Sequence, residues 1–268
     1  MNNLTKRILS AGVILPPILA LLFYGKPIHV AAFSVILSGI AAFEFANITL
    51  EKNSIILKYL TSSLSSIFAM AIGSSQKFPL ITIFFIITIA PIIFILTMFK
   101  KGEFKDQFFE ASKSLTAIIY TGSLFGSMAL IPIMNPDNGK FWLLLLMSSV
   151  IFNDTLAYTT GKLFGKTKFS KISPNKTLEG SIGGLGGSII AVLAVKFIFL
   201  QDLPLLQTAV FGLILGVAGQ LGDLMESFIK RSFNVKDSGN IIPGHGGIFD
   251  RLDSMMTGAP VVLIFSLL

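Results

Sequence analysis

The sequence predicts an all-α, polytopic integral membrane protein with about nine transmembrane helices. Of its 268 residues, 53% are hydrophobic and only 13% are charged, whereas soluble domains carry about 25% charged residues. The mean hydropathy is +0.78. The chain has no cysteine, which excludes disulfide scaffolds, thiolate zinc sites and cysteine nucleophiles.

The apolar residues fall into runs that are long enough to cross a bilayer core, which takes roughly 20 residues per helix. In chain order these runs are 8–24, 29–50, 57–73, 79–99, 114–134, 141–160, 181–200, 204–227 and 248–268. The first run has no small-residue cleavage site after it, so we expect a retained helix rather than a signal peptide. Pro16, Pro17 and Pro91 lie inside runs, where membrane helices tolerate proline.

The basic residues predict the orientation of the bundle. One set of alternating connections holds 17 Lys and Arg residues and the other set holds three, while Lys196 lies inside a run. Because basic residues favour the cytoplasmic side, we expect the N-terminus and the long connections to lie in the cytosol. The sequence therefore predicts a multi-pass protein of the cell (inner, cytoplasmic) membrane.

Acidic residues inside apolar runs are the first candidates for function, because an ionisable group in a membrane is costly. We select four of the acids in these runs as candidates, all near the cytosolic side: Glu44, Asp154, Asp223 and Asp250. This shared depth indicates an active-site cavity that opens to the cytosol.

Spacing groups further polar residues with these acids. Asp223 and Lys230 lie on one helix face, and Asp250 and Asp253 lie one helical turn apart. Carboxylates gathered in this way repel one another unless one is neutralised or binds a metal, and oxygen ligands suit Mg²⁺. Alternatively, Asp250, Arg251 and Asp253 form only a salt-bridged helix start.

Two connections carry dense polar and glycine-rich sequence. Residues 176–184 place a lysine and backbone N–H groups at an expected helix start, which favours phosphate; the alternative is a simple helix cap. The spacing is not that of a Walker A loop. The second connection brings together Lys230, Arg231, Lys236, Asp237, His245, Gly246, Gly247, Asp250, Arg251 and Asp253. Its glycines permit close approach to a ligand. Three roles are open for His245: it binds phosphate, donates a proton or caps the helix start.

Sixteen of the 24 glycines lie after residue 150. We therefore divide the chain into an N-terminal transmembrane scaffold, 1–134, and a catalytic transmembrane region, 135–268, with cytosolic loops 161–180 and 228–247. Gly183/Gly187 and Gly212/Gly216 have the small-xxx-small spacing of closely packed membrane helices.

Residues 227–253 resemble the signature of the phosphatidate cytidylyltransferase (CDP-diacylglycerol synthase) family. The pattern is S-x-x-K-R-x₄-K-D, a spacer, and P-x-H-G-G-x-x-D-R-x-D, and this sequence shows no departure from it. The segments 154–158, 161–166 and 173–180 are similar to another segment shared by the family. The resemblance covers the second half of the chain, and the first five runs match only in being hydrophobic.

The resemblance implies that the cytidylyl group of CTP is transferred to phosphatidate in phospholipid biosynthesis, giving CDP-diacylglycerol and pyrophosphate. It also implies that Mg²⁺ is required. Whether a second cation also binds is left open. CTP, phosphatidate and membrane lipid are the expected partners; no nucleic acid is expected, and a homodimer is left open.

On this interpretation, several residues take particular roles. The expected catalytic residues are Asp223, Asp250, Lys230 and Arg251. The expected metal ligands are Asp223 and Asp250, followed by Asp253 and Asp154. The expected contacts to CTP or phosphatidate are Ser173, Lys176, Arg231, Lys236, Asp237, His245, Gly246 and Gly247.

Other classes of protein remain as alternatives. A transporter would also carry intramembrane acids, but here the acids gather on one side and no inverted repeat is visible. A CTP-using lipid kinase would release CDP instead of pyrophosphate. A purely structural membrane protein would not need the charge density of residues 227–253.

Overall fold

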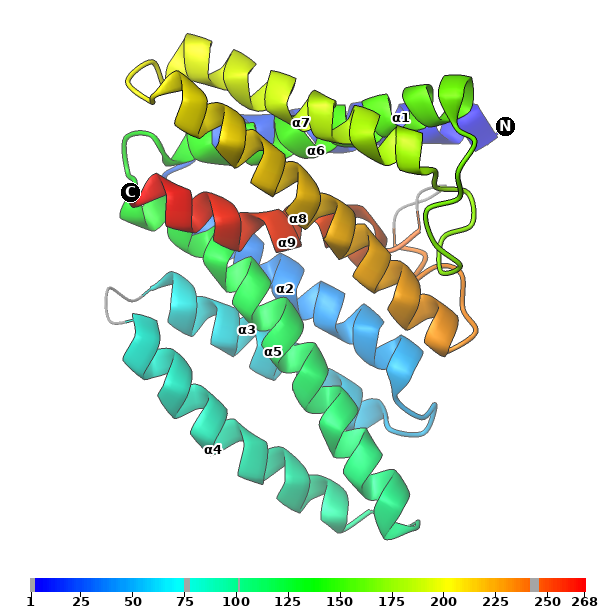
Figure 1. Ribbon diagram of the computed structural model, residues 1–268. Coiled ribbons are helices and arrows are strands. Elements are labelled where there is room, and N and C mark those ends of the chain that lie inside the picture. Colours follow the sequence, from blue (N-terminus) through cyan, green and yellow to red (C-terminus); the bar gives the residue numbers. More distant parts are fainter. Residues whose placement is uncertain (1–2, 75–77, 101, 242–245) are drawn as a thin grey trace. The chain divides into compact units, whose positions relative to one another are not determined.

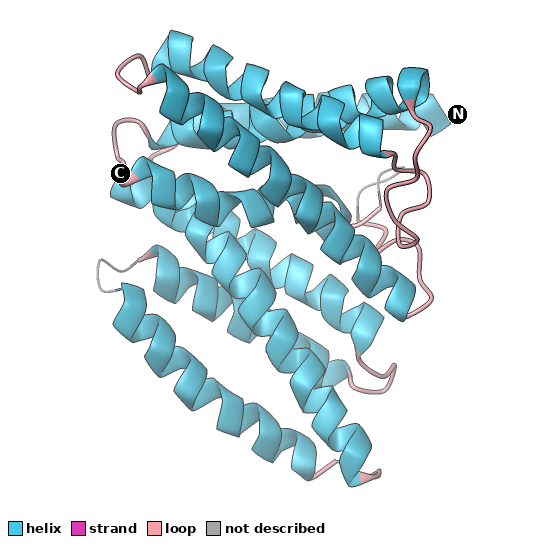
Figure 2. Cartoon of the chain, viewed as in Figure 1, coloured by secondary structure: helices cyan, strands magenta, loops and turns pink. Residues whose placement is uncertain are grey.

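The computed structural model describes residues 3–74, 78–100, 102–241 and 246–268. Within these ranges, the regular secondary structure consists of helices (Figure 2). An isolated β-bridge joins Lys168 and Thr177. The helices labelled in Figure 1 are α1 (Asn3–Tyr24), α2 (Pro27–Thr49), α3 (Ile55–Gly73), α4 (Phe78–Met98), α5 (Phe104–Met134), α6 (Gly139–Phe164), α7 (Leu178–Phe199), α8 (Leu205–Ser232) and α9 (Phe249–Ser266). The all-α prediction is confirmed for this part of the chain.

Several helices extend beyond the predicted runs. Helix α5 begins at Phe104, upstream of the predicted run 114–134, while α6 continues to Phe164 and α8 to Ser232. The two long connections are therefore shorter than the predicted 161–180 and 228–247. The reason is that a helix satisfies its own backbone hydrogen bonds in water as well as in lipid, so it does not end where its apolar residues end.

Six of the described helices are long and apolar enough to cross a membrane: α2, α3, α5, α6, α7 and α8. This supports a membrane protein. In α1 and α4 the described apolar parts are the shorter stretches Leu15–Tyr24 and Ile87–Met98. The first turns of the 18-residue helix α9 carry Asp250, Arg251 and Asp253. The number of nine spans stays a prediction.

The chain forms two compact units. The first comprises Met1–Ile133 and Val235–Arg251, and the second comprises Met134–Asn234 and Leu252–Leu268. The connection after α8 thus belongs to the first unit, together with the N-terminal helices. The division into scaffold and catalytic region concerns activity and stays a prediction.

In the first unit, buried hydroxyl groups join α3 to its neighbours. Ser65 Oγ lies 2.8 Å from Ser38 Oγ of α2 and 2.7 Å from Thr121 Oγ1 of α5. At Gly126 of α5, an added Cβ would lie only 2.8 Å from Cβ of Ile72 in α3. Small residues and paired hydroxyls are typical of tightly packed membrane helices.

In the second unit, α7 packs against both α6 and α8. Ser188 of α7 links both neighbours, with its Oγ 2.6 Å from Ser149 Oγ and donating to the carbonyl of Gly212 at 2.7 Å. At Gly216 of α8, an added Cβ would lie 2.9 Å from the Cβ of Ser188. The predicted close packing at Gly212 and Gly216 is confirmed, and it fixes the three helices that carry the candidate site.

Candidate active site

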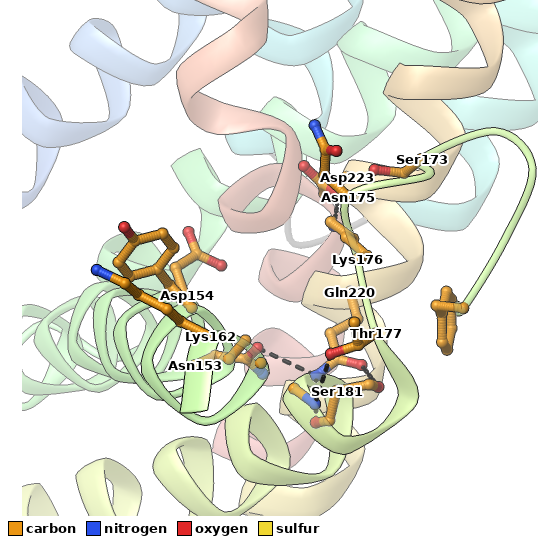
Figure 3. Close-up of a pocket in the computed structure, with 15 residues that line it drawn as sticks. Asn153, Asp154, Lys162, Ser173, Asn175, Lys176, Thr177, Ser181, Gln220 and Asp223 are labelled. Carbon is orange, nitrogen blue, oxygen red and sulfur yellow. Dashed lines mark hydrogen bonds and ion pairs between the residues drawn. The ribbon is translucent and has the colours of Figure 1, made fainter. Parts of the chain in front are cut away.

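A cavity of about 480 Å³ lies in the second unit, lined by α6, α7, α8 and the connection 165–177 (Figure 3). Four residues predicted from the sequence line this cavity: Asp154, Ser173, Lys176 and Asp223. Its lining is mixed, since the rings of Tyr158 and Phe169 complement the charged and amide side chains.

An ion pair between Lys176 and Asp223 lies in the cavity wall. It joins the connection 165–177 to helix α8 (Figure 3). Burial lowers the pKa of Lys176, while the carboxylates of Asp154, Asp253 and Glu226 act in the opposite direction. Carboxylates on three helices, α6, α8 and α9, therefore favour the charged form of this ammonium group.

The connection that carries Lys176 is shaped by local hydrogen bonds. The backbone N–H of Lys176 donates to the carbonyl of Ser173 at 3.1 Å, which places both residues in one turn. Thr177 caps α7 by accepting the N–H of Gly180 at 3.2 Å. The carboxylate of Glu179 accepts the N–H of Lys166 at 3.1 Å. The helix cap that the sequence left open is thus present, and phosphate binding there remains a prediction.

Three further polar residues that the sequence analysis missed also line the cavity: Asn153, Ser181 and Gln220 (Figure 3). Gln220 Nε2 donates to the carbonyl of Ser181 at 2.9 Å and to Oδ1 of Asn153 at 3.2 Å. Ser181 Oγ in turn donates to Oε1 of Gln220. The sequence contained a signal for this network, because amide residues stand close to acids in otherwise apolar runs. Gln220 precedes Asp223 by almost one helical turn, and Asn153 directly precedes Asp154.

Further charged residues of the second unit lie on α8 and α9. Lys230 Nζ pairs with Oε1 of the buried Glu226 at 2.7 Å. Asp253 is buried, and its Oδ1 accepts the N–H of Ser254 at 2.7 Å. Arg231 is exposed in the last turn of α8. Lys230 thus has a partner on its own helix, an arrangement that the spacing i, i+4 allows.

The remaining predicted residues belong to the first unit. Asp250 Oδ2 accepts the N–H groups of Ser238 at 2.8 Å and Gly247 at 2.9 Å. Gly246 has a φ of +87°, a backbone conformation that favours glycine. The other predicted residues here, all exposed, are Lys236, Asp237 and Arg251. His245 lies outside the described residues.

The donor set of the second unit suits a hard cation. Among the residues that the structure describes, no three acidic or histidine side chains lie close enough together to hold a metal ion. The charged residues of the cavity lining are two carboxylates, Asp154 and Asp223, and two lysines, Lys162 and Lys176. Carboxylate oxygens are the ligands that Mg²⁺ prefers, so the residue types suit Mg²⁺, and the magnesium site itself stays a prediction.

The fold and the cavity define the class of this protein: a membrane protein that is helical over its described residues, with a site that combines lysines, carboxylates and amide groups. The chain matches the cytidylyltransferase family over residues 5–268. It therefore belongs to that family.

Curated relatives carry a more specific name. The chain is 42% identical to the phosphatidate cytidylyltransferase of Staphylococcus saprophyticus over 63% of each chain. It is 41% identical to that of Staphylococcus aureus over 67% of each chain. It is also 42% identical to that of Synechocystis over 50% of this chain and 47% of the relative. The match thus spans 63% of the length of the Staphylococcus saprophyticus relative.

Replacing Gln220 with leucine tests the amide network. The change leaves the carbonyl of Ser181 and Oδ1 of Asn153 without the Gln220 donor, so we expect the free energy of unfolding to fall by about 1–3 kcal/mol. Thermal unfolding in detergent measures this as a lower Tm. Gln201→Leu, at an exposed position between α7 and α8, is the matched control and should keep the wild-type Tm. Equal Tm values for the two variants would contradict the network's importance.

Proposed function

We propose that this protein is a phosphatidate cytidylyltransferase, which transfers the cytidylyl group of CTP to phosphatidate and releases pyrophosphate. The observation that carries the proposal is the ion pair of Lys176 and Asp223 in a cavity of mixed lining, in a chain that belongs to the cytidylyltransferase family. The names of the relatives support the choice of phosphatidate as acceptor.

The reaction needs no nucleophile from the protein. A phosphate oxygen of phosphatidate attacks the α-phosphorus of CTP, and a new P–O bond forms while the bond from that phosphorus to the pyrophosphate oxygen breaks. The pyrophosphate leaves with the bonding electrons. Such phosphoryl-type transfer depends mainly on positioning and on neutralisation of charge, which lysines and carboxylate-bound cations provide.

We assign the triphosphate of CTP to Lys176 and Ser173, which share one turn at the cavity wall. Lys230 and Arg231 would neutralise phosphate charge, and Arg251 would orient a carboxylate or phosphate. The remaining proposed substrate contacts are Lys236, Asp237, His245, Gly246 and Gly247.

Mg²⁺ is the proposed cofactor, with Asp223 and Asp250 as principal ligands and Asp154 and Asp253 as further ones. The support is the set of carboxylate oxygens on Asp154, Asp223 and Asp253 in the second unit, because such oxygens are the ligands that Mg²⁺ prefers. When bound, Mg²⁺ would neutralise the charge that develops on the triphosphate. Whether a second cation also binds is left open.

We further propose that the protein crosses the cell membrane nine times, with the cavity open to the cytosol. The support is the asymmetry of basic residues along the chain. A cytosolic opening suits the reaction, because CTP is a soluble anion and phosphatidate is held in the leaflet.

The activity is tested with purified protein, CTP, phosphatidate and Mg²⁺, with and without a chelator. We expect CDP-diacylglycerol and pyrophosphate, and their loss with chelator. In Asp223→Asn, kcat/KM should fall by about 100-fold or more, because a preorganised charge is removed. The control Asp202→Asn, at an exposed position between α7 and α8, should keep wild-type activity.

The other outcomes of this assay contradict the proposal in different ways. Release of CDP would indicate a lipid kinase, and absence of any CTP-dependent product would favour a transporter. Full turnover by Asp223→Asn would overturn the assignment of Asp223.

The absence of cysteine from the sequence makes the orientation directly measurable, because each introduced cysteine is the only one. In intact spheroplasts, a membrane-impermeant maleimide should label Asp137→Cys, in the connection between α5 and α6. Lys171→Cys, in the connection between α6 and α7, should react only after permeabilisation. The reverse pattern would invert the proposed topology.

A further inference from the structure

A buried carboxylate of the N-terminal region holds the segment that carries Asp250. Glu44 of α2 is 2% exposed. Its Oε1 accepts the N–H of Ile248 at 3.1 Å, and its Oε2 accepts the N–H of Phe249 at 2.7 Å. Because these N–H groups belong to the start of α9, which no helical carbonyl can reach, the side chain of Glu44 acts as the cap of that helix.

The same carboxylate reaches a second stretch of chain. Oε2 of Glu44 also accepts the hydroxyl of Ser238 at 3.1 Å, and the N–H of Ser238 donates to Oδ2 of Asp250 at 2.8 Å. Ser238 therefore bridges the two carboxylates. A change at Glu44 is transmitted to Asp250 through this residue and through the backbone from Ile248 onward.

Glycines make this close approach possible. An added Cβ at either Gly239 or Gly247 would lie 2.6 Å from Oε1 of Glu44, and one at Gly246 would lie 2.7 Å from Oδ2 of Asp250. Contacts this short exclude a side chain unless the carboxylates move. Gly246 and Gly247, which the sequence suggested for approach to a ligand, are thus packed against the carboxylates of Asp250 and Glu44.

Aromatic packing reinforces the contact beside Glu44. The ring of Phe249, which is fully buried, lies edge-on to Phe45 of α2 at 5.8 Å and to Tyr120 of α5 at 6.2 Å between ring centroids. The start of α9 is therefore held by α2 through both polar and apolar contacts.

We propose that Glu44 is a positioning residue for the reaction, which sets the backbone of Ile248, Phe249 and Asp250. This inference rests on the proposed function, in which Asp250 is a metal ligand. Glu44 touches no substrate; it acts through the first turn of α9. Helix α2, which was assigned to the scaffold, thus contributes one specific side chain to the segment that carries Asp250.

A matched control exists in the same unit. Glu110 of α5 is 3% exposed and also accepts three hydrogen bonds, from the N–H of Glu51 at 3.0 Å, the hydroxyl of Ser54 at 2.7 Å and the ammonium of Lys100 at 3.0 Å. It differs from Glu44 in that these three partners do not belong to the segment before α9. Loss of a buried carboxylate can therefore be separated from loss of the contact with this segment.

The test compares Glu44→Gln with Glu110→Gln in the full-length protein. Gln keeps the shape of Glu44 but turns an NH₂ group toward N–H donors, so the start of α9 should loosen. We expect kcat to fall between about 10-fold and 100-fold, because small misplacement of reacting groups is costly, with the KM for CTP changed less than about three-fold on the same argument. Hydrogen exchange at the amides of residues 247–249 should speed up in Glu44→Gln alone.

Conservative variants keep the test decisive if Glu44→Gln does not fold. Glu44→Asp retains the charge and should recover part of the lost kcat, and Ser238→Ala removes only one of the three hydrogen bonds and should cause a smaller loss. Similar losses of kcat in Glu44→Gln and Glu110→Gln, or wild-type kcat despite faster exchange, would overturn the positioning role. If wild-type protein makes no CDP-diacylglycerol, the proposed function fails, and the exchange measurement still decides whether Glu44 holds this segment.

Discussion

The structure depends on one constraint: carboxylates placed in or beside apolar helices must be satisfied by specific partners. An unpaired charge in such surroundings costs several kcal/mol. The buried carboxylates of Glu44 and Glu226 have such partners: Glu44 accepts hydrogen bonds from two backbone N–H groups and a hydroxyl, and Glu226 pairs with Lys230. Because these partners come from defined loops and helices, satisfying the charges also arranges the segments that carry the candidate site.

Most of the fold was predictable from hydropathy, and the errors have a common cause. Apolar runs located every described helix, because a span needs a minimum length of apolar sequence. They misplaced the ends of α5, α6 and α8, where polar residues continue the helix beyond the apolar run. Hydropathy indicates whether a side chain prefers water or lipid, whereas the length of a helix is set by its backbone hydrogen bonds.

The candidate site was predictable only in part. The motif around residues 173–180 and the acid in α8 identified Lys176 and Asp223, which the structure brings together in one cavity. The amide network of Gln220 depends on how three helices pack, and a single sequence does not report that packing. The contact between Glu44 and Ile248 joins residues 204 positions apart, so no local pattern could reveal it.

The central claim is that the cavity of the second unit binds the nucleotide, and protection of a single cysteine measures this directly. Asn175→Cys places a thiol in the cavity lining, and Lys171→Cys places one in the same connection outside that lining. Saturating CTP with Mg²⁺ should slow maleimide labelling of Asn175→Cys by about ten-fold or more, as expected when a bound ligand covers the cavity wall. It should leave Lys171→Cys unaffected. Equal labelling of Asn175→Cys with and without CTP would contradict the account.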